Sequence, residues 1–454
     1  MFKEISPLDG RYAATLEPLG DVFSEFALVR ERCVVECLYL KALDATRVFP
    51  SLTADETNRI NEAVASFNED DFARVKEIES ETKHDVKACE LFLRERLQLA
   101  NPEMIHFGLT SADINNLATA RILTFYRDRH QLPQLREVIA ALTDLAEAWK
   151  STPFPARTHG QPASPTTAGK EVAVFISRLL RQARRLEVHR LRAKLNGATG
   201  TYAAFAVAAP EIDWPAFSKR FVENMNLEWN ACTTQVESGD SLAEYLDITT
   251  RINSIVHDLD LDLWQYISRG EIIQRPVSGE VGSSTMPHKV NPIRFENSEG
   301  NIVIANALLP ALASKLPQSR MQRDLSGSTV QRNVGVALAH SYLALQQTMQ
   351  GLGRIDIDRE VALQHVESHP EVLAEAIQTI LRAEGVDDPY ALLKTLTRGQ
   401  TLSIKDLHTW IDGLDLQDAL KVRLHALTPG TYIGHAEDIC DDVICEARQW
   451  LSGS

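Results

Sequence analysis

The hydrophobic positions along the chain recur mainly at steps of three and four residues, the spacing of one face of an α-helix. The longest such stretch begins at Ser241 and continues to Gly270. Ser241 with Glu244 is typical of a capping box, and Gly270 is typical of a helix end. The pattern therefore predicts a helix of about 28 residues, roughly 40 Å long at 1.5 Å per residue.

The same spacing predicts three further long helices, at 166–197, from about 297 onward, and at 335–351. Pro310 should kink or interrupt the helix that contains it, because proline cannot donate a backbone hydrogen bond. Strand-like alternation is sparse, and its short candidates are 203–209 and 233–237. Long helices joined by loops rich in Gly and Pro favour an all-α fold with an elongated central bundle.

The chain has 454 residues, too many for one compact core, so several substructures are expected. The changes in helix length and loop composition divide it into three parts. Residues 1–100 form a mostly helical N-terminal domain. Residues 101–355 form the central bundle of long helices. Residues 356–454 form a C-terminal domain of shorter helices.

Composition narrows the class of partner. Apolar residues make up 44% and charged residues 24% of the chain, and the formal net charge is −15. This acidic balance argues against nucleic acid or an anionic membrane as the main partner, while a local basic pocket for a small anion remains compatible with it. The chain lacks an N-terminal apolar signal segment and any apolar run long enough for a membrane span.

The six cysteines are scattered and none forms a C-x-x-C pair. Histidines do not cluster at zinc-ligand spacing either, so the sequence predicts no metal site. Scattered thiols of this kind are typical of reduced cysteines in the cytoplasm, which is the expected location.

Four polar loops stand out between the helical stretches: 6–12, 81–88, 106–116 and 157–171. Each has an ordinary structural interpretation. Asp85 would cap a helix beginning at Val86, and Thr110 with Ser111 would cap a helix beginning near Ala112. Taken together, however, polar loops of this density at helix junctions favour a binding site.

The stretch 278–301 is the densest of these polar segments. Gly279 and Gly282 allow a loop that closes over a ligand. The loop also carries two adjacent hydroxyls, a cation and an amide, on Ser283, Ser284, Lys289 and Asn291. A charged surface loop with a helix cap is the alternative, but such a loop does not need so many donors. Hydroxyls, an amide and a cation together favour binding of a carboxylate.

Common hydrolase, nucleotide-binding and metalloprotease motifs are absent from the sequence, so Ser283 does not read as a hydrolase nucleophile. His159 and Ser283 instead fit a proton-transfer pair. One would remove a proton beside a carboxylate and the other would protonate a leaving group. The reaction class is a β-elimination that needs neither a metal nor an organic cofactor.

The segment GSSTMPHKVNP at 282–292 resembles the signature loop of the fumarase/aspartase superfamily of lyases. His288 and THGQPA at 158–163 are similar to the adenylosuccinate lyase branch of that superfamily, in its longer bacterial form. The resemblance covers almost the whole chain. It implies a three-domain, mainly helical protomer, a homotetramer with active sites shared between subunits, and no cofactor. The implied reactions release fumarate from adenylosuccinate, giving AMP, and from succinylated carboxamide ribotide, in purine biosynthesis.

The resemblance also implies roles for individual residues. His159 matches the general acid and Ser283 the general base, while Glu296 matches a carboxylate that supports His159. Lys289 would steady the charge that develops on the substrate carboxylate. The positions that match substrate contacts are Arg11, Tyr12, His84, Asp85, His106, Thr110, Ser111, Gln235, Ser284, Lys289, Asn291, Arg323, Ser328 and Arg332.

Two other functions are compatible with parts of the sequence. A sister lyase would act on argininosuccinate or aspartate, but Arg323, Ser328 and Arg332 favour a phosphorylated substrate. A non-catalytic helical scaffold would keep the signature loop as a relic. The simultaneous presence of His159, Ser283 and Lys289 argues against that alternative.

Overall fold

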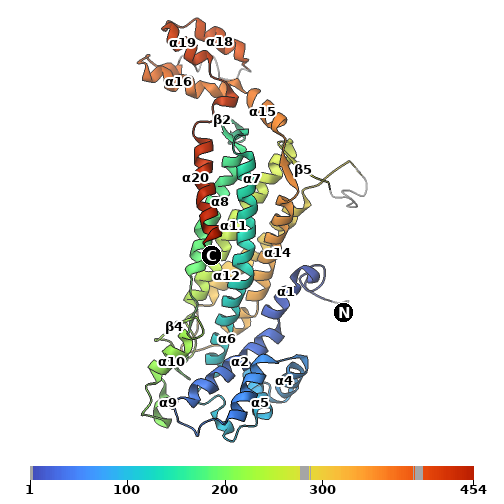
Figure 1. Ribbon diagram of the computed structural model, residues 1–454, viewed down its shortest axis with the longest axis vertical. Helices are drawn as coiled ribbons and strands as arrows, with labels where there is room; N and C mark the ends of the chain where they lie inside the picture. The colour runs from blue at the N-terminus through green and yellow to red at the C-terminus, as the bar shows by residue number, and fades with distance from the viewer. Residues whose placement is uncertain (1–3, 277–285, 287, 392, 394–401, 454) are drawn as a thin grey trace. The chain divides into compact units, whose positions relative to one another are not determined.

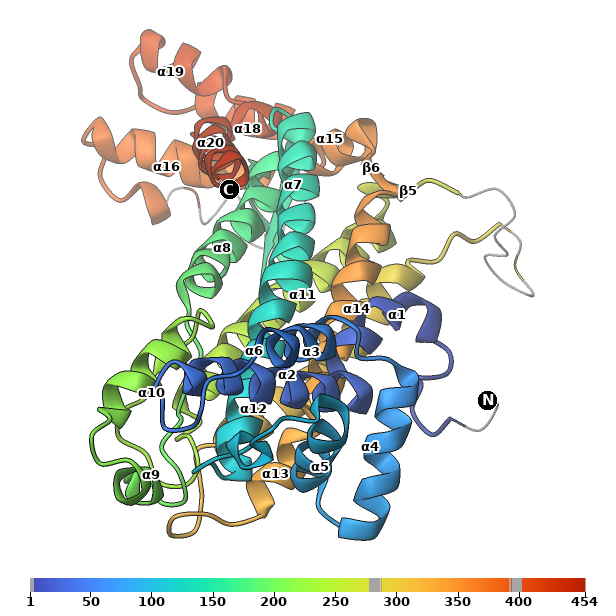
Figure 2. The same ribbon diagram turned by 60° about the horizontal axis from the view of Figure 1, so that its bottom comes forward.

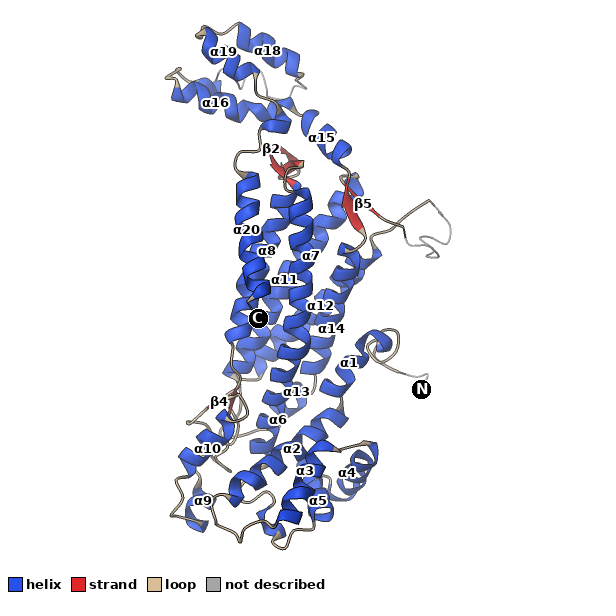
Figure 3. Ribbon diagram, viewed as in Figure 1, coloured by secondary structure: helices blue, strands red, loops and turns tan. Residues whose placement is uncertain are grey.

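A computed structural model of the chain describes residues 4–276, 286, 288–391, 393 and 402–453. Helices dominate these residues (Figures 1 and 3), and the strands in the described ranges form three two-stranded sheets. The all-α class predicted from the hydrophobic spacing is therefore confirmed. The chain divides into two compact units, 1–134 with 182–254 and 300–344, and 135–181 with 255–299 and 345–454. The division into three domains stays a prediction.

The longest helices in the described part of the chain after residue 130 are α7 (Leu132–Trp149), α8 (Ala168–Val188), α11 (Asp240–Arg269), α12 (Ile293–Lys315) and α14 (Val334–Leu352). The predictions for α11 and α14 are confirmed to within a few residues. The predicted capping box at Ser241 is wrong, because α11 already begins at Asp240. The Ser241 hydroxyl accepts a hydrogen bond from the Arg192 amide at 2.9 Å instead.

Two other helix predictions need correction. The helix expected to end near Gly197 ends at Val188. Beyond it the chain turns into β3 (Arg192–Ala193), which pairs in parallel with β4 (Glu228–Trp229). The helix expected from about 297 begins at Ile293 and continues through Pro310. Pro310 is exposed, so water can replace the helical hydrogen bond that proline removes.

Both strand predictions are wrong. Residues 203–208 form α9 (Ala203–Ala208), because Phe205 alone of that short helix is buried, against Trp214. A strand would instead bury every second side chain. Residues 233–237 have no regular structure. The actual strands include the hairpin β1 (Pro153–Thr158) and β2 (Gln161–Thr167), whose proline-rich sequence gave no strand signal.

The first unit contains the N-terminal helices and their loops. They are α1 (Ala13–Phe23), α2 (Glu25–Asp44), α3 (Ala54–Ala65), α4 (Glu69–Thr82), α5 (Asp85–Leu97), α6 (Ser111–Tyr126), α9, α10 (Trp214–Glu223) and α13 (Ser326–Gln331). A π-helical turn, Arg127–Gln131, joins α6 to α7, and a 3₁₀ turn lies at Pro102–Met104. Helices α2, α5 and α6 contact one another (Figure 2), through buried side chains such as Val35, Leu93 and Leu117.

The second unit contains β1, β2, β5 (Ile272–Gln274), β6 (Ile355–Ile357), α15 (Arg359–Glu367), α16 (Ala374–Ala383), α18 (Ile404–Asp412), α19 (Asp418–His425) and α20 (Ala436–Ser452). Its 3₁₀ turns are Pro370–Leu373 and Pro429–Thr431. Helices α16, α18 and α19 share a small core that includes Ile377, Leu407 and Leu424.

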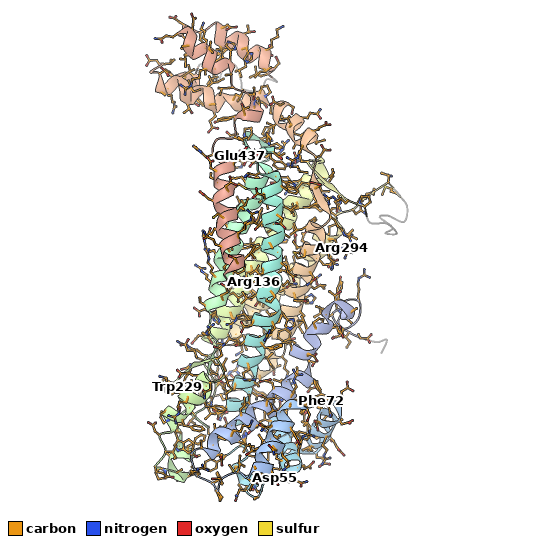
Figure 4. The ribbon with its side chains drawn as sticks, in the orientation of Figure 1. Asp55, Phe72, Arg136, Trp229, Arg294 and Glu437 are labelled. Carbon is orange, nitrogen blue, oxygen red and sulfur yellow. The ribbon has the colours of Figure 1, made fainter. Side chains whose placement is uncertain are left out.

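Helix α20 returns to pack against α7. The guanidinium of Arg136, labelled in Figure 4, lies 4.2 Å from the centroid of the Trp450 ring, and Lys150 pairs with Asp441 at 2.8 Å. Among the described residues, no helix is both long and apolar enough to cross a membrane.

Candidate active site

A cavity of about 390 Å³ opens in the first unit. Its wall comes from α1, α2, the junction of α4 and α5, α6, and the segment around α13. Six residues predicted from the sequence to contact substrate line it: His84, Asp85, Ser111, Arg323, Ser328 and Arg332. The first three of these residues are more than 200 positions from the last three along the chain, so their shared cavity supports the prediction that they act together.

Arg32 is a residue of this wall that the sequence analysis missed. Its Nη2 donates to Asp85 Oδ2 at 2.8 Å, and its Nε donates to Asn115 Oδ1 at 2.8 Å. Arg32 is 5% exposed and lies among mostly apolar buried residues of α2 such as Cys33 and Val35. A charged residue at a core-facing helical position was the signal that could have identified it.

Arg32 and Arg332 act on the same carboxylate. Arg332 Nη2 lies 3.7 Å from Asp85 Oδ2, the oxygen that also accepts from Arg32. Partial burial by itself raises the pKa of Asp85, but the charge of Arg32, a hydrogen bond from the Val86 amide and the charge of Arg332 together lower that pKa below its ordinary value. Asp85 is therefore a carboxylate at neutral pH.

The turn between α4 and α5 is built differently from the prediction. Asp85 does not precede the helix as its cap but is the first residue of α5, and His84 is the N-cap. The Nδ1 atom of His84 accepts a hydrogen bond from the Lys87 amide at 3.2 Å. His84 also lines the cavity.

His106 lies in a loop held by a buried acid and an aromatic cluster. Its Nδ1 is 2.5 Å from Oε1 of Glu36, which is fully buried. Burial by itself lowers the pKa of His106, but the hydrogen bond and charge of Glu36, with the charges of Glu90 and Asp113, raise it above its ordinary value. The backbone of His106 has a φ of 62°, a left-handed conformation that is uncommon outside glycine.

Thr110 is the N-cap of α6, as the cap interpretation expected, and the helix begins at Ser111. Its amide donates to Asp113 Oδ2 at 2.9 Å. The other oxygen of Asp113 pairs with Lys194 Nζ at 2.8 Å, and neither of these two side chains is exposed. This buried pair fixes the start of α6, which places Ser111 in the cavity wall.

Gln235 is bound at both ends of its side-chain amide. Its Nε2 donates to the Ala198 carbonyl at 2.8 Å, and its Oε1 accepts from Arg323 Nη1 at 2.9 Å. Gln235 thus orients a cation of the cavity, although it is outside the described wall. Other predicted contacts that lie outside that wall are Arg11, Tyr12, His106 and Thr110.

His159 occupies the turn of the hairpin in the second unit. Thr158 pairs with Gln161 in register, so His159 and Gly160 form a two-residue turn with φ values of 54° and 76°. Positive φ at both positions is the geometry of a type I′ turn. An imidazole is rarely placed there, and its side chain is exposed at the tip of the hairpin.

The signature loop is described only in part. Ser283 and Ser284 lie outside the described residues, as does the rest of 277–285. Lys289 is exposed and Asn291 is half-buried just before α12. Glu296, on the first turn of α12, accepts a hydrogen bond from Trp264 Nε1 at 3.1 Å. Its predicted support of His159 therefore stays a prediction. In the described ranges, His, Cys, Asp and Glu side chains do not gather in threes that could hold a metal ion.

Comparison with known proteins gives full-length matches. Residues 10–306 match a family described as Lyase, and residues 319–433 match one described as Adenylosuccinate lyase C-terminal. The adenylosuccinate lyase of Haemophilus influenzae is 46% identical over 96% of this chain and 98% of its own length. That of Escherichia coli K12 is 45% identical over 97% and 98%, and that of Dictyostelium discoideum is 44% identical over 96% and 97%.

The chain belongs to the adenylosuccinate lyase family. The resemblance found in the signature loop is thereby confirmed over nearly the whole length. Solved structures share the fold at low identity. A fumarate lyase from Mesorhizobium is 20% identical with a TM-score of 0.78, over 94% of this chain and 97% of its own. The 3-carboxy-cis,cis-muconate lactonizing enzyme from Pseudomonas putida is 19% identical with a TM-score of 0.76, over 96% of this chain and 98% of its own.

Proposed function

We propose that this chain is a C–N lyase that cleaves adenylosuccinate to AMP and fumarate, and succinylated carboxamide ribotide to its carboxamide and fumarate. The observation that carries the proposal is the identity of about 45% with adenylosuccinate lyases over nearly the full chain. The cavity supports it, because Arg323 and Arg332 in its wall suit a phosphate. No such cation set is needed for argininosuccinate or aspartate.

The proposed chemistry is a β-elimination. Ser283 takes the proton from the carbon beside a carboxylate, and Lys289 steadies the negative charge that spreads onto that carboxylate. The electron pair forms the double bond of fumarate as the C–N bond breaks, and His159 donates its proton to the departing nitrogen. Serine is a poor base in water, so Ser283 must be desolvated when the loop closes over the substrate.

The conformation of the hairpin supports the role of His159. A tight turn with two positive φ values places the imidazole at an exposed tip, where it can reach a ligand. Residues held in uncommon backbone regions persist where the surrounding structure fixes them, often at functional sites. The paired strands β1 and β2 supply that constraint here.

We further propose a homotetramer in the cytoplasm, with active sites shared between subunits. Large apolar side chains on α11 and α12 are exposed in the single chain, as expected of helices that pack against other copies. They are Leu261, Trp264, Val303 and Ile304.

The decisive experiment supplies purified protein with adenylosuccinate and follows both the ultraviolet absorbance of the purine and the release of fumarate. Turnover is expected. If the protein does not cleave adenylosuccinate but does cleave argininosuccinate, the proposed substrate is wrong. The same assay with argininosuccinate as a parallel sample is therefore part of the design.

Variants of the two proposed catalytic residues test the roles and the shared sites. Ser283→Ala and His159→Asn should each abolish elimination, and asparagine is the better replacement at 159 because it tolerates a positive φ. When the two inactive variants are mixed and their subunits exchange, some activity should return. It should return at sites that combine the intact His159 of one variant with the intact Ser283 of the other. If subunits exchange and activity does not return, the sites are not shared.

A further inference from the structure

Arg32 links three elements of the cavity wall in the first unit. It lies on α2 and is almost fully buried. It bonds Asp85 at the start of α5 and Asn115 on α6, each at 2.8 Å. Figure 2 shows α2, α5 and α6 side by side. All three residues line the cavity, so the guanidinium ties together the surface on which a ligand would rest.

Asp85 presents a problem for binding an anion. It is a carboxylate 29% exposed in a wall whose other charged groups include Arg323 and Arg332. Arg332 Nη2 is already only 3.7 Å from Asp85 Oδ2. Without another partner, this carboxylate would attract the Arg332 guanidinium and compete with a ligand anion for it. Arg32 is closer, at 2.8 Å, and far less exposed.

We propose that Arg32 is a positioning residue for the proposed reaction: it fixes Asp85 and Asn115 in the cavity wall and occupies the Asp85 carboxylate, which leaves Arg332 available to bind the substrate phosphate. This inference rests on the proposed function. It predicts that Arg32 acts on phosphate affinity through Asp85, without touching the ligand itself.

The test uses Arg32→Met, with Arg30→Met as a matched control on the same helix. Arg30 is half-buried and donates to the Asp21 carbonyl at 2.7 Å, remote from Asp85. Loss of one ion pair at about 3 Å should weaken AMP binding by at least about tenfold in Arg32→Met. Arg30→Met should bind AMP as the wild type does. Circular dichroism and melting temperature show whether each variant folds.

A second substitution separates charge compensation from mere packing. In Arg32→Met/Asp85→Asn, the carboxylate that competes for Arg332 is gone. AMP affinity should therefore recover by several-fold relative to Arg32→Met, even though elimination stays impaired. If Arg32 only fills space, the double variant will bind AMP no better than the single one, and that result overturns the proposal.

The pH dependence gives an independent readout. Arg32 contributes to the low pKa of Asp85, whose other near neighbours are Arg332, the Val86 amide and His84. In Arg32→Met the pKa of Asp85 should rise, so the gain in AMP affinity that follows protonation of Asp85 should begin at a higher pH than in the wild type. A packing defect would not shift the pH at which this gain begins. If the pH dependence of AMP affinity is the same in Arg32→Met and in the wild type, that result counts against the proposal.

Wild-type protein that fails to cleave adenylosuccinate refutes the proposed function instead. Wild-type turnover with Arg32→Met binding AMP normally refutes only the role of Arg32.

Discussion

Asp260 is a buried carboxyl group in the middle of α11, and the described groups that shift its pKa include no cation. It is 1% exposed, and its two oxygens accept from the Thr348 hydroxyl at 3.0 and 3.1 Å. The Ser298 hydroxyl bonds Thr348 at 2.8 Å. Burial raises the pKa of Asp260 well above its ordinary value, although the hydroxyls of Ser298 and Thr348 oppose that shift. The folded protein therefore holds a neutral acid here.

The sign and size of the effect on stability follow from proton binding. Above a pH of about 3.9 the unfolded chain releases this proton, while the folded chain keeps it up to its raised pKa. Stability therefore falls as pH rises through that window, by about 1.4 kcal/mol per pH unit. The loss accumulates over the pH interval between the ordinary and the raised pKa of Asp260 and stops above the raised pKa.

The perturbation is Asp260→Asn, which has nearly the same shape and removes the titrating proton. Its amide oxygen can accept from Thr348 as the carboxyl does. Free energies of unfolding of variant and wild type are measured in urea at about pH 5 and about pH 8, at one fixed protein concentration. The variant should gain stability relative to wild type on going to the higher pH, by at most about 1.4 kcal/mol for each pH unit.

Asp247→Asn is the matched control, because Asp247 lies on the same helix and is exposed. The difference in the free energy of unfolding between Asp247→Asn and wild type should change little between the two pH values. Taking the difference between pH values cancels any direct packing effect of the new amide. If Asp260→Asn differs from wild type by the same amount at both pH values, Asp260 is not a neutral buried acid, and the electrostatic reasoning is refuted.

The remaining predictions concern the loop of His106. Glu36→Gln should lower the pKa of His106, because the bond and charge that raise it are lost. AMP binding should then weaken near neutral pH and recover in acid, and equal weakening at every pH would contradict this. Gly108→Ala should destabilise the fold by more than about 1 kcal/mol, because Gly108 has a φ of 68° and a Cβ would lie 2.5 Å from the Phe205 ring. Gly300→Ala, where a Cβ meets nothing within 4 Å, should be neutral or stabilising by thermal melting.

Helix content was accessible from the sequence because helical periodicity is a local property. Apolar residues three and four positions apart predicted α11 and α14 to within a few residues. The hairpin that carries His159 was not predicted. Its two strands contain Pro153, Pro155, Pro162 and Pro165, and proline has a low propensity for β-strands. Their pairing depends on contacts between the two strands, which the local sequence does not specify. The end of α8 was missed because β3 diverts the chain toward β4, which lies far along the sequence.

The candidate site divides in the same way. The sequence determined the family and the residues worth testing. It did so through a long, specific signature loop and the order of the polar motifs, which are short stretches of consecutive residues. Only the tertiary structure decided that Arg32 lies against Asp85, that Glu36 holds His106, and that Asp260 is buried against Thr348. Such pairings join residues far apart in sequence, and their energies depend on burial, which the local pattern does not specify.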